Sequence, residues 1–247
     1  DAQLSRGLGD VYKRQAESGV PVSEAYFVDT EEEYSYMILN YIEGINGVDS
    51  EEEEFKKIYK TLGGYAKKFN SIEVNGFGRN VKNEKDGFFE SWKDFNKSKI
   101  DFLFGDGVLV KNNVITEKQS EFIQNRLSEM EAWDSAPKLC HGNMHISNTI
   151  VSPDGTVYLI DWGNGVGHLA PHVDLADIIA WRTSREYLDY FLEGYGMSQK
   201  EYEEIEHDLN NILIIQLLDV IKRGIEMGKE FKEGQVEGFV ERILKLE

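Results

Sequence analysis

The chain has 247 residues, 40% of them hydrophobic, which is enough for one large domain or two modest ones with a real core. Lys and Arg total 27 against 45 Asp and Glu, and the formal net charge of −18 disfavours nucleic acid or an anionic membrane as a partner. The longest apolar runs, such as 212–218, are far shorter than the ~20 residues that span a bilayer. The single cysteine, Cys140, is expected to be a small apolar residue in a buried strand. We expect a cytoplasmic protein.

The first fifteen residues, DAQLSRGLGDVYKRQ, show no hydrophobic periodicity that continues into the next segment. Residues 10–15 are similar to a translated transposase-based sequencing adapter. We therefore expect residues 1–15 to be an artefactual tail, with an ordinary disordered tail as the alternative.

Residues 20–42 predict a β-hairpin. The apolar segment 25–28 and the segment 34–42 (YSYMILNYI) flank an acidic turn at 29–33. Ser50 and Glu53 are spaced as a capping box, and the apolar positions that follow recur every three or four residues until about Asn70. An amphipathic helix is therefore expected after the hairpin.

Further helices are expected downstream. A second helical region contains four aromatic residues expected in the core, namely Phe88, Phe89, Trp92 and Phe95. A third helix runs through Phe122 to Trp133 and ends before Ser135, and residues 187–195 and 205–221 read as successive helices of a bundle. Four other residues are expected in structural roles: incidental loop positions for His168 and His172, and packing for Trp162 and Trp181.

Residues 139–181 (LCHGNMHISNTIVSPDGTVYLIDWGNGVGHLAPHVDLADIIAW) contain two short apolar strands, 149–151 and 156–160. They are joined by Ser-Pro-Asp-Gly, whose proline and glycine suit a type I turn. This second hairpin brings Asn148, before the first strand, close to Asp161, after the second. Side-chain oxygens of this kind, completed by water and phosphate, suit Mg²⁺.

The motifs in this segment resemble those of the aminoglycoside phosphotransferase and choline kinase-like small-molecule kinases. HGNMHISN is similar to the family pattern H-G-D-x-H-x-x-N, LIDWGNG to its metal-binding I-D-W/F segment, and Asp174-Leu175-Ala176 to its D-L-A. The resemblance covers about residues 16–247. It implies an α/β (α+β), protein-kinase-like fold, with a partial N-terminal lobe and hinge at 16–43 and a mainly helical C-terminal lobe at 44–247 that holds the catalytic hairpin.

The resemblance also implies roles for individual residues. Asn148 and Asp161 would hold Mg²⁺, His145 would lie where related protein kinases bring a basic side chain to the transferred phosphate, and His141 would brace the catalytic loop. Asn143 would occupy the position of the catalytic aspartate. Hinge residues would offer backbone hydrogen bonds to the base of ATP or GTP, and these are Leu39, Asn40, Tyr41 and Ile42.

Two departures from the family pattern affect the expected activity. Asn143 cannot accept a proton as an aspartate does. The glycine-rich strand pair and lysine strand of the N-terminal lobe do not precede the hinge, so weak ATP binding is expected.

The expected function is transfer of the γ-phosphate of a magnesium-bound nucleotide to a hydroxyl of an aminoglycoside, choline or sugar-like acceptor. The alternatives are a pseudokinase-like binding module without turnover and a metal-dependent hydrolase built on His141 and His145.

Overall fold

A computed structural model describes residues 18–31, 34–79, 89–162, 166–181, 184–229, 231 and 234–245. The expected tail at 1–15, part of the acidic turn at 29–33, and Phe88 lie outside these ranges. The strands are β1 (Ala25–Glu31), β2 (Tyr34–Leu39), β3 (Ile45–Asn46), β4 (Gly78–Arg79), β5 (Lys138–Cys140), β6 (Thr149–Val151), β7 (Val157–Leu159) and β8 (Val166–His168). The helices are α2 (Glu52–Phe69), α3 (Trp92–Phe104), α4 (Val108–Lys111), α5 (Glu117–Ser128), α6 (His172–Trp181), α7 (Arg185–Tyr195), α8 (Gln199–Glu226) and α9 (Gln235–Leu244), with short 3₁₀ turns η1 (Gly47–Asp49), η2 (Glu129–Ala132) and η3 (Ile146–Asn148).

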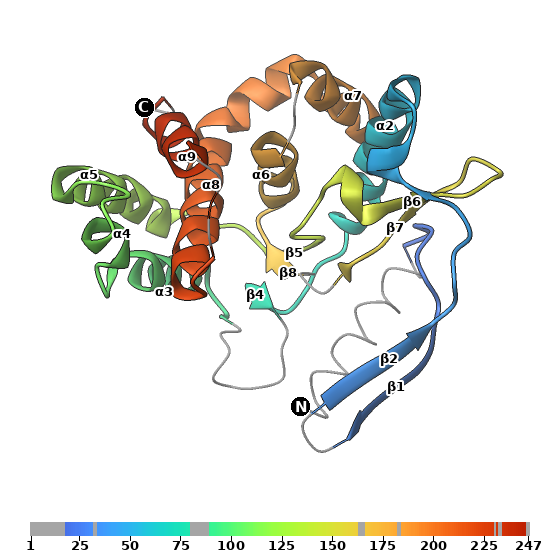
Figure 1. Cartoon of the computed structure of the whole chain (residues 1–247). Helices are drawn as coiled ribbons and strands as arrows, with labels where there is room; N and C mark the ends of the chain where they lie inside the picture. The colour runs from blue at the N-terminus through green and yellow to red at the C-terminus, as the bar shows by residue number, and fades with distance from the viewer. Residues whose placement is uncertain are drawn as a thin grey trace.

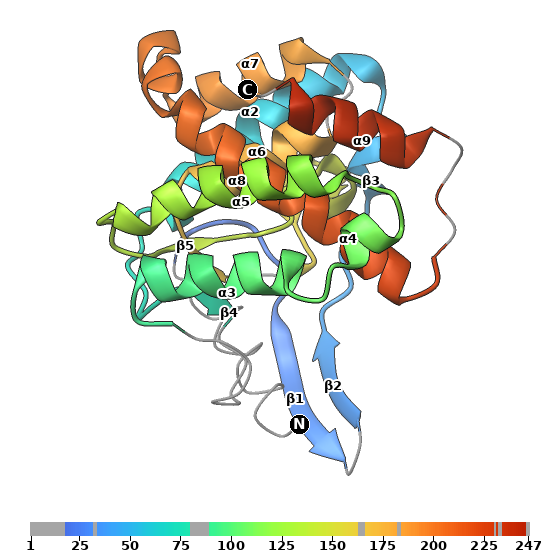
Figure 2. The ribbon, with the colours of Figure 1, turned by 90° about the vertical axis from the view of Figure 1, so that its left-hand side faces the viewer.

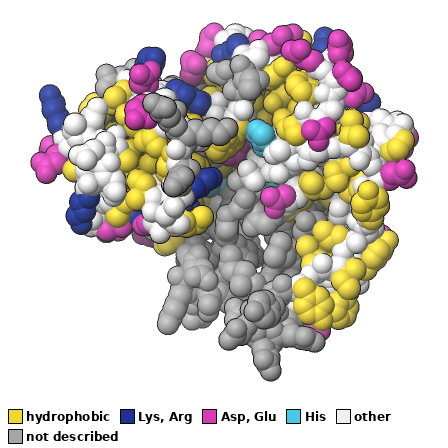
Figure 3. Space-filling view, viewed as in Figure 1, with side chains coloured by type: hydrophobic (Ala, Val, Ile, Leu, Met, Phe, Trp, Pro, Cys, Tyr) yellow, Lys and Arg dark blue, Asp and Glu magenta, His cyan; other side chains and the backbone are white. Residues whose placement is uncertain are grey.

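The first predicted hairpin is confirmed. β1 and β2 pair antiparallel, and Figures 1 and 2 show this ribbon extending away from the helical body. Apolar side chains cover much of the exposed hairpin in Figure 3, and the large exposed ones are Tyr26, Phe27, Tyr36 and Ile38. The N-terminal part of the described chain is therefore a two-stranded ribbon, whereas the core lies in the helical part.

The second predicted hairpin is also confirmed. β6 pairs with β7, and β3 adds to the other side of β6. The turn closes through the Gly155 N–H, which donates to the Ser152 carbonyl at 2.8 Å, and Gly155 has a φ of +82° that suits glycine. A second small sheet has the order β4-β8-β5. His168 lies in its strand β8 and His172 begins α6, so the expected loop around these two histidines is wrong.

The predicted capping box at the start of α2 is wrong, although the helix is present. Glu51 is the N-cap and makes no side-chain capping bond. Ser50 instead ends the 3₁₀ turn η1, where its N–H donates to the Gly47 carbonyl. Because that turn uses Ser50, the helix begins one residue later than the box requires. The predicted end is correct, since Asn70 is the C-cap.

The aromatic residues expected in the core lie there where they are described. Trp92 and Phe95 are buried, and Phe89 packs against the same cluster. Trp162 is almost fully buried, as expected, and so is Cys140 in β5.

α6 lies in the middle of the helical body (Figures 1 and 2). Every residue from Val173 to Ala180 is buried, including Asp174 and Asp177. Buried carboxylates are costly unless they are hydrogen-bonded, and so their partners identify the part of the chain that α6 holds in place.

Candidate active site

The loop of residues 141–148, here called the catalytic loop, is held by Asp174 of α6. One carboxylate oxygen of Asp174 accepts the backbone N–H groups of His141 and Gly142 at 3.0 and 3.1 Å. The other accepts from the Asn70 side chain at 2.9 Å. Burial raises the pKa of Asp174 to about 6, against the lowering effect of these hydrogen bonds. The start of the catalytic loop is therefore anchored by the buried carboxylate of Asp174.

Asp177, one turn further along α6, holds the next part of the loop. Its carboxylate accepts the Met144 N–H at 3.0 Å and a hydrogen bond from the Gln216 side chain at 3.0 Å. Burial, followed by the nearby charge of Asp174, raises the pKa of Asp177 well above its usual value. Asp177 was not identified from the sequence. A second carboxylate three positions after Asp174, in an otherwise apolar segment, was the signal that could have identified it.

His141 joins the catalytic loop to the end of β7. The ring is completely buried, and its Nε2 donates to the Ile160 carbonyl at 3.0 Å, since a carbonyl can only accept. Burial lowers the pKa of His141 to about 4, so the ring is uncharged at neutral pH. It packs edge-on against Trp162 with ring centroids 4.5 Å apart. His141 therefore supports the catalytic loop from within the protein interior.

His145 is hydrogen-bonded within the loop. Its Nδ1 accepts the Ser147 N–H at 3.1 Å, and the Ser147 hydroxyl lies 2.6 Å from the same nitrogen. Burial lowers the pKa of His145, and a backbone hydrogen bond with Trp181 opposes this effect. Burial therefore disfavours the charged form of the ring, and His145 offers the site a hydrogen-bonding group.

Asn148 and Asp161 flank the paired ends of β6 and β7. Thr149 pairs with Leu159, and the Ile160 N–H donates to the Asn148 carbonyl at 2.9 Å. The hairpin therefore brings the backbones on either side of the two residues together.

The side chains of Asn148 and Asp161 suit a hard cation. The Nδ2 of Asn148 donates to the Asn143 carbonyl at 2.9 Å, which leaves its Oδ1 as an acceptor. Asp161 is exposed, with a φ of +57°, and no hydrogen bond between described residues engages its carboxylate. One carboxylate and one amide oxygen fit Mg²⁺ that takes its remaining ligands from water and phosphate.

The hinge residues divide into two pairs. Leu39 pairs with Ala25 in the first hairpin, and Asn40 donates its N–H to the Glu24 carbonyl at 2.9 Å. Tyr41 is 87% exposed, whereas Ile42 is buried. The Asn40 N–H is thus engaged within the hairpin, and the backbone of Tyr41 and Ile42 is the part left to meet a ligand.

A sequence model of the phosphotransferase enzyme family matches residues 3–207, and this match begins inside the segment expected as an adapter-derived tail. The chain belongs to the phosphotransferase enzyme family. A search of curated proteins found no match.

Solved structures of aminoglycoside phosphotransferases share the fold of this family member. A thermostable mutant of APH(4)-Ia, in ternary complex with AMP-PNP and hygromycin B, has a TM-score of 0.72 at 18% identity, covering 100% of this chain and 83% of that chain. ADP-bound APH(2'')-Ib has a TM-score of 0.64 at 19% identity, covering 99% and 82%. The expected kinase-like fold is confirmed.

Asn143, which was expected at the position of the catalytic aspartate, lies in the catalytic loop. Its side chain is partly exposed, and no hydrogen bond among the described residues engages its amide. The backbone on either side is fixed, because Gly142 and Met144 donate to the α6 carboxylates. Asn143 is therefore a side chain with a fixed backbone and a free amide at the surface of the catalytic loop.

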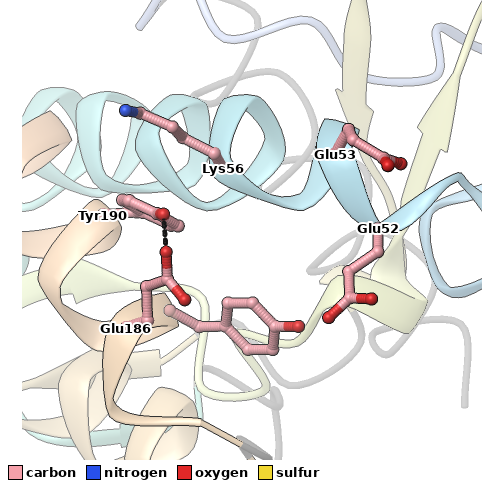
Figure 4. Close-up of a pocket in the computed structure, with 6 residues that line it drawn as sticks. Glu52, Glu53, Lys56, Glu186 and Tyr190 are labelled. Atoms are coloured by element: carbon pink, nitrogen blue, oxygen red, sulfur yellow. Dashed lines mark hydrogen bonds between the residues drawn. The ribbon is translucent and has the colours of Figure 1, made fainter.

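A cavity of about 410 Å³ lies between α2 and α7, and it is lined by residues other than those described above. Figure 4 shows the Glu186 carboxylate hydrogen-bonded to the Tyr190 hydroxyl, and Lys56 lies 5.2 Å from the centre of the Tyr190 ring. The lining residues are Glu52, Glu53, Lys56, Glu186, Tyr187 and Tyr190. None of them belongs to the catalytic loop or to the β6–β7 hairpin, and the group carries three carboxylates against the single ammonium of Lys56.

Proposed function

We propose that this phosphotransferase moves the γ-phosphate of ATP or GTP, bound with magnesium, to a hydroxyl group of a small molecule. An aminoglycoside, choline or a sugar-like compound is the proposed acceptor class. The family match supports phosphotransfer. The neighbouring structures, one with AMP-PNP and hygromycin B and one with ADP, support a nucleotide and a small polyol as the two substrates.

The observation that carries this proposal is that one fixed loop and one hairpin bring the backbones of Asn143, Asn148 and Asp161 to the same end of the hairpin. Asn148 contacts the Asn143 backbone directly, and the β6–β7 pairing brings Asp161 to the same end of the hairpin. Asn148 and Asp161 would hold the magnesium ion, which supplies neutralisation of phosphate charge when bound. Asn143 would then lie on the acceptor side, next to the metal-binding amide.

The role proposed for Asn143 is to orient the acceptor hydroxyl through its amide oxygen. Asn cannot take up the proton at useful pH. Phosphoryl transfer has a loose transition state and depends mainly on positioning and charge neutralisation, so an orienting amide is compatible with slow turnover. His141 would keep the loop in place from the interior, and the α6 carboxylates would keep its backbone N–H groups fixed.

The hydrolase alternative has no support in the described part of the chain. No group of three or more His, Cys, Asp or Glu side chains there could hold a metal ion, and His141 is completely buried. Among the described residues, none of the helices combines the length and the hydropathy of a membrane-spanning segment. A binding module without turnover is the outcome that the activity test below would reveal.

The test is transfer of phosphate with ATP or GTP, MgCl₂ and a panel of hygromycin B, kanamycin, choline and glucose, followed by mass spectrometry of the acceptor. We expect an acceptor heavier by one phosphate. Asp161→Asn should abolish magnesium-dependent nucleotide binding in calorimetry, because it removes the anionic ligand. The matched control is Asp154→Asn, an exposed aspartate in the turn of the same hairpin. Equal nucleotide affinity in the two variants would contradict the proposed metal site.

A further inference from the structure

Gln216, in the middle of α8, joins this helix to the support of the catalytic loop. α8 packs beside α6, as Figures 1 and 2 show. The Gln216 Nε2 group donates to the Val173 carbonyl at 3.1 Å and to the Asp177 carboxylate at 3.0 Å, and both acceptors belong to α6. Because Asp177 also accepts the Met144 N–H, α6, α8 and the catalytic loop meet at one carboxylate.

The orientation of the Gln216 amide is fixed by its partners. The Val173 carbonyl can only accept a hydrogen bond, so the atom that faces it is the NH₂ group and not the amide oxygen. The amide oxygen Oε1 is buried and has no hydrogen-bond partner among the described residues. An unpaired buried acceptor is costly, and this cost offsets much of what the two hydrogen bonds contribute to stability. The carboxylate that Gln216 orients therefore explains this amide better than stability does.

Asp177 uses its two oxygens for different partners. Oδ1 accepts from Gln216, and Oδ2 accepts the Met144 N–H at 3.0 Å. The torsion that turns a carboxyl group about its own axis is broad, so one hydrogen bond alone leaves it free to rotate. Since the carboxyl group is planar, a donor held on Oδ1 also sets the direction in which Oδ2 accepts.

The peptide unit between Asn143 and Met144 carries this contact into the site. A peptide unit is planar, and its N–H and C=O point to opposite sides of one rigid plane. The Met144 N–H donates to Asp177, and the Asn143 carbonyl accepts from Asn148 Nδ2 at 2.9 Å. A continuous row of hydrogen bonds therefore runs from Gln216 through Asp177 and this peptide to the amide that is proposed to bind magnesium.

We propose that Gln216 is a positioning residue for phosphoryl transfer, acting through Asp177 and the 143–144 peptide to set the places of Asn143 and Asn148. The proposal rests on the phosphotransfer function proposed above. Gln216 keeps the acceptor side and the metal side of the site in one arrangement. Small displacements of reacting groups lower turnover strongly, so the loss of this contact should affect kcat.

The first experiment measures backbone amide hydrogen exchange by NMR in the full chain, without any substrate. Gln216→Met keeps the length of the side chain and removes both donors. The Met144 amide should exchange ~10-fold faster, because a hydrogen bond of ordinary strength is worth about that factor. The Gly142 amide, held by Asp174, should keep its rate.

Ile212→Val is the matched control for general loosening of α8, because it truncates a buried side chain of the same helix. Any change in this variant should affect the Gly142 and Met144 amides equally. In Gln216→Met, an unchanged Met144 rate, or equal acceleration of both amides, would overturn the proposal.

The second experiment exchanges the acid and the amide. In Asp177→Asn/Gln216→Glu, the NH₂ group at residue 177 can donate to the carboxyl group at residue 216, and the oxygen at 177 can still accept the Met144 N–H. Gln216→Glu alone places two carboxyl groups against each other. We expect kcat for phosphate transfer to fall ~10-fold in Gln216→Met and Gln216→Glu, with little change in the acceptor KM, and to recover in the double variant.

Gln199→Met, an exposed position of the same helix, should leave kcat unchanged. A double variant no faster than Gln216→Glu would overturn the proposed role. Full kcat and normal Met144 exchange in Gln216→Met would refute the role of Gln216 and leave the proposed function intact. Absence of phosphate transfer from the parent chain would instead refute the function, and the exchange rates would still decide whether Gln216 positions the loop.

Discussion

Replacement of Asp174 tests how the catalytic loop is held. In Asp174→Asn, the amide oxygen can still accept the N–H groups of His141 and Gly142, but its NH₂ group would face the NH₂ group of Asn70. In Asp174→Ala the two backbone N–H groups lose their partner, whereas the Asn70 amide keeps its hydrogen bond to the Leu139 carbonyl. The two variants are both uncharged at this position, so their difference in stability reports the hydrogen bonds without any contribution from ionisation.

The magnitudes follow from the pKa and the hydrogen bonds. Raising the pKa of Asp174 from 3.8 to about 6 means that its ionised form costs the fold about 3 kcal/mol at pH 7. Asp174→Asn removes this cost and loses one charge-assisted bond worth ~1.5–3 kcal/mol, so its free energy of unfolding should lie within ~1.5 kcal/mol of the parent. Asp174→Ala leaves two buried backbone N–H groups unpaired and should be ~2–6 kcal/mol less stable than Asp174→Asn.

The assay is urea unfolding at pH 7, followed by circular dichroism, with Asp189→Ala as a control. Asp189 is an exposed residue of α7 paired with Arg185, and its loss should change stability by less than ~1 kcal/mol. Because the pKa of Asp174 is raised in the fold, its protonation stabilises the fold as the pH falls through about 6. The free energy of unfolding of the parent should therefore rise relative to that of Asp174→Asn when the pH is lowered from 7 to 5. Equal stability of Asp174→Ala and Asp174→Asn would refute the reasoning.

Three further predictions concern stability. Gly63→Ala should cost ~1–3 kcal/mol because its Cβ would overlap the Phe191 carbonyl of α7, whereas Gly64→Ala, with 3.7 Å to the nearest atom, should gain up to ~1 kcal/mol; equal effects in thermal unfolding would contradict this. The melting temperature should fall as the pH is lowered from 6.5 to 4. Three histidines that burial keeps uncharged in the fold take up protons in the unfolded chain, and the resulting loss of stability exceeds the gain from protonation of the two buried aspartates; a constant melting temperature would contradict this. Their pKa values are lowered to about 4, 3 and 4 in His141, His168 and His172. Deletion of residues 1–15 should leave the melting temperature within a few degrees, and a large drop would show that this segment belongs to the fold.

The parts of the site that depend on local sequence could be predicted. The Ser-Pro-Asp-Gly turn lies between two short apolar strands, so the β6–β7 hairpin and the approach of Asn148 to Asp161 followed from pairing alone. The core aromatics Trp92 and Phe95 were also identified, because apolar periodicity is a local signal.

The parts that depend on tertiary contacts could not be predicted. Asp177 binds Met144 across 33 residues, and Asn70 reaches Asp174 across 104, and neither separation leaves a pattern in the sequence. Trp181 was expected to pack, and its ring does contact His145 and Phe239, but the 38% of it that stays exposed depends on these long-range contacts. Ser50 fits a capping box in the sequence, but the 3₁₀ turn before α2 uses it first.

Asn143→Asp is the most direct test of whether the catalytic loop positions an acceptor hydroxyl at residue 143. This change supplies a proton acceptor and leaves Asn148, Asp161 and the hinge unaltered. We predict that kcat for phosphate transfer to an acceptor used by both proteins rises at least ~10²-fold, with little change in nucleotide affinity, because a positioned general base contributes that much. Equal rates for the parent chain and Asn143→Asp would contradict the assignment of residue 143 to the acceptor hydroxyl.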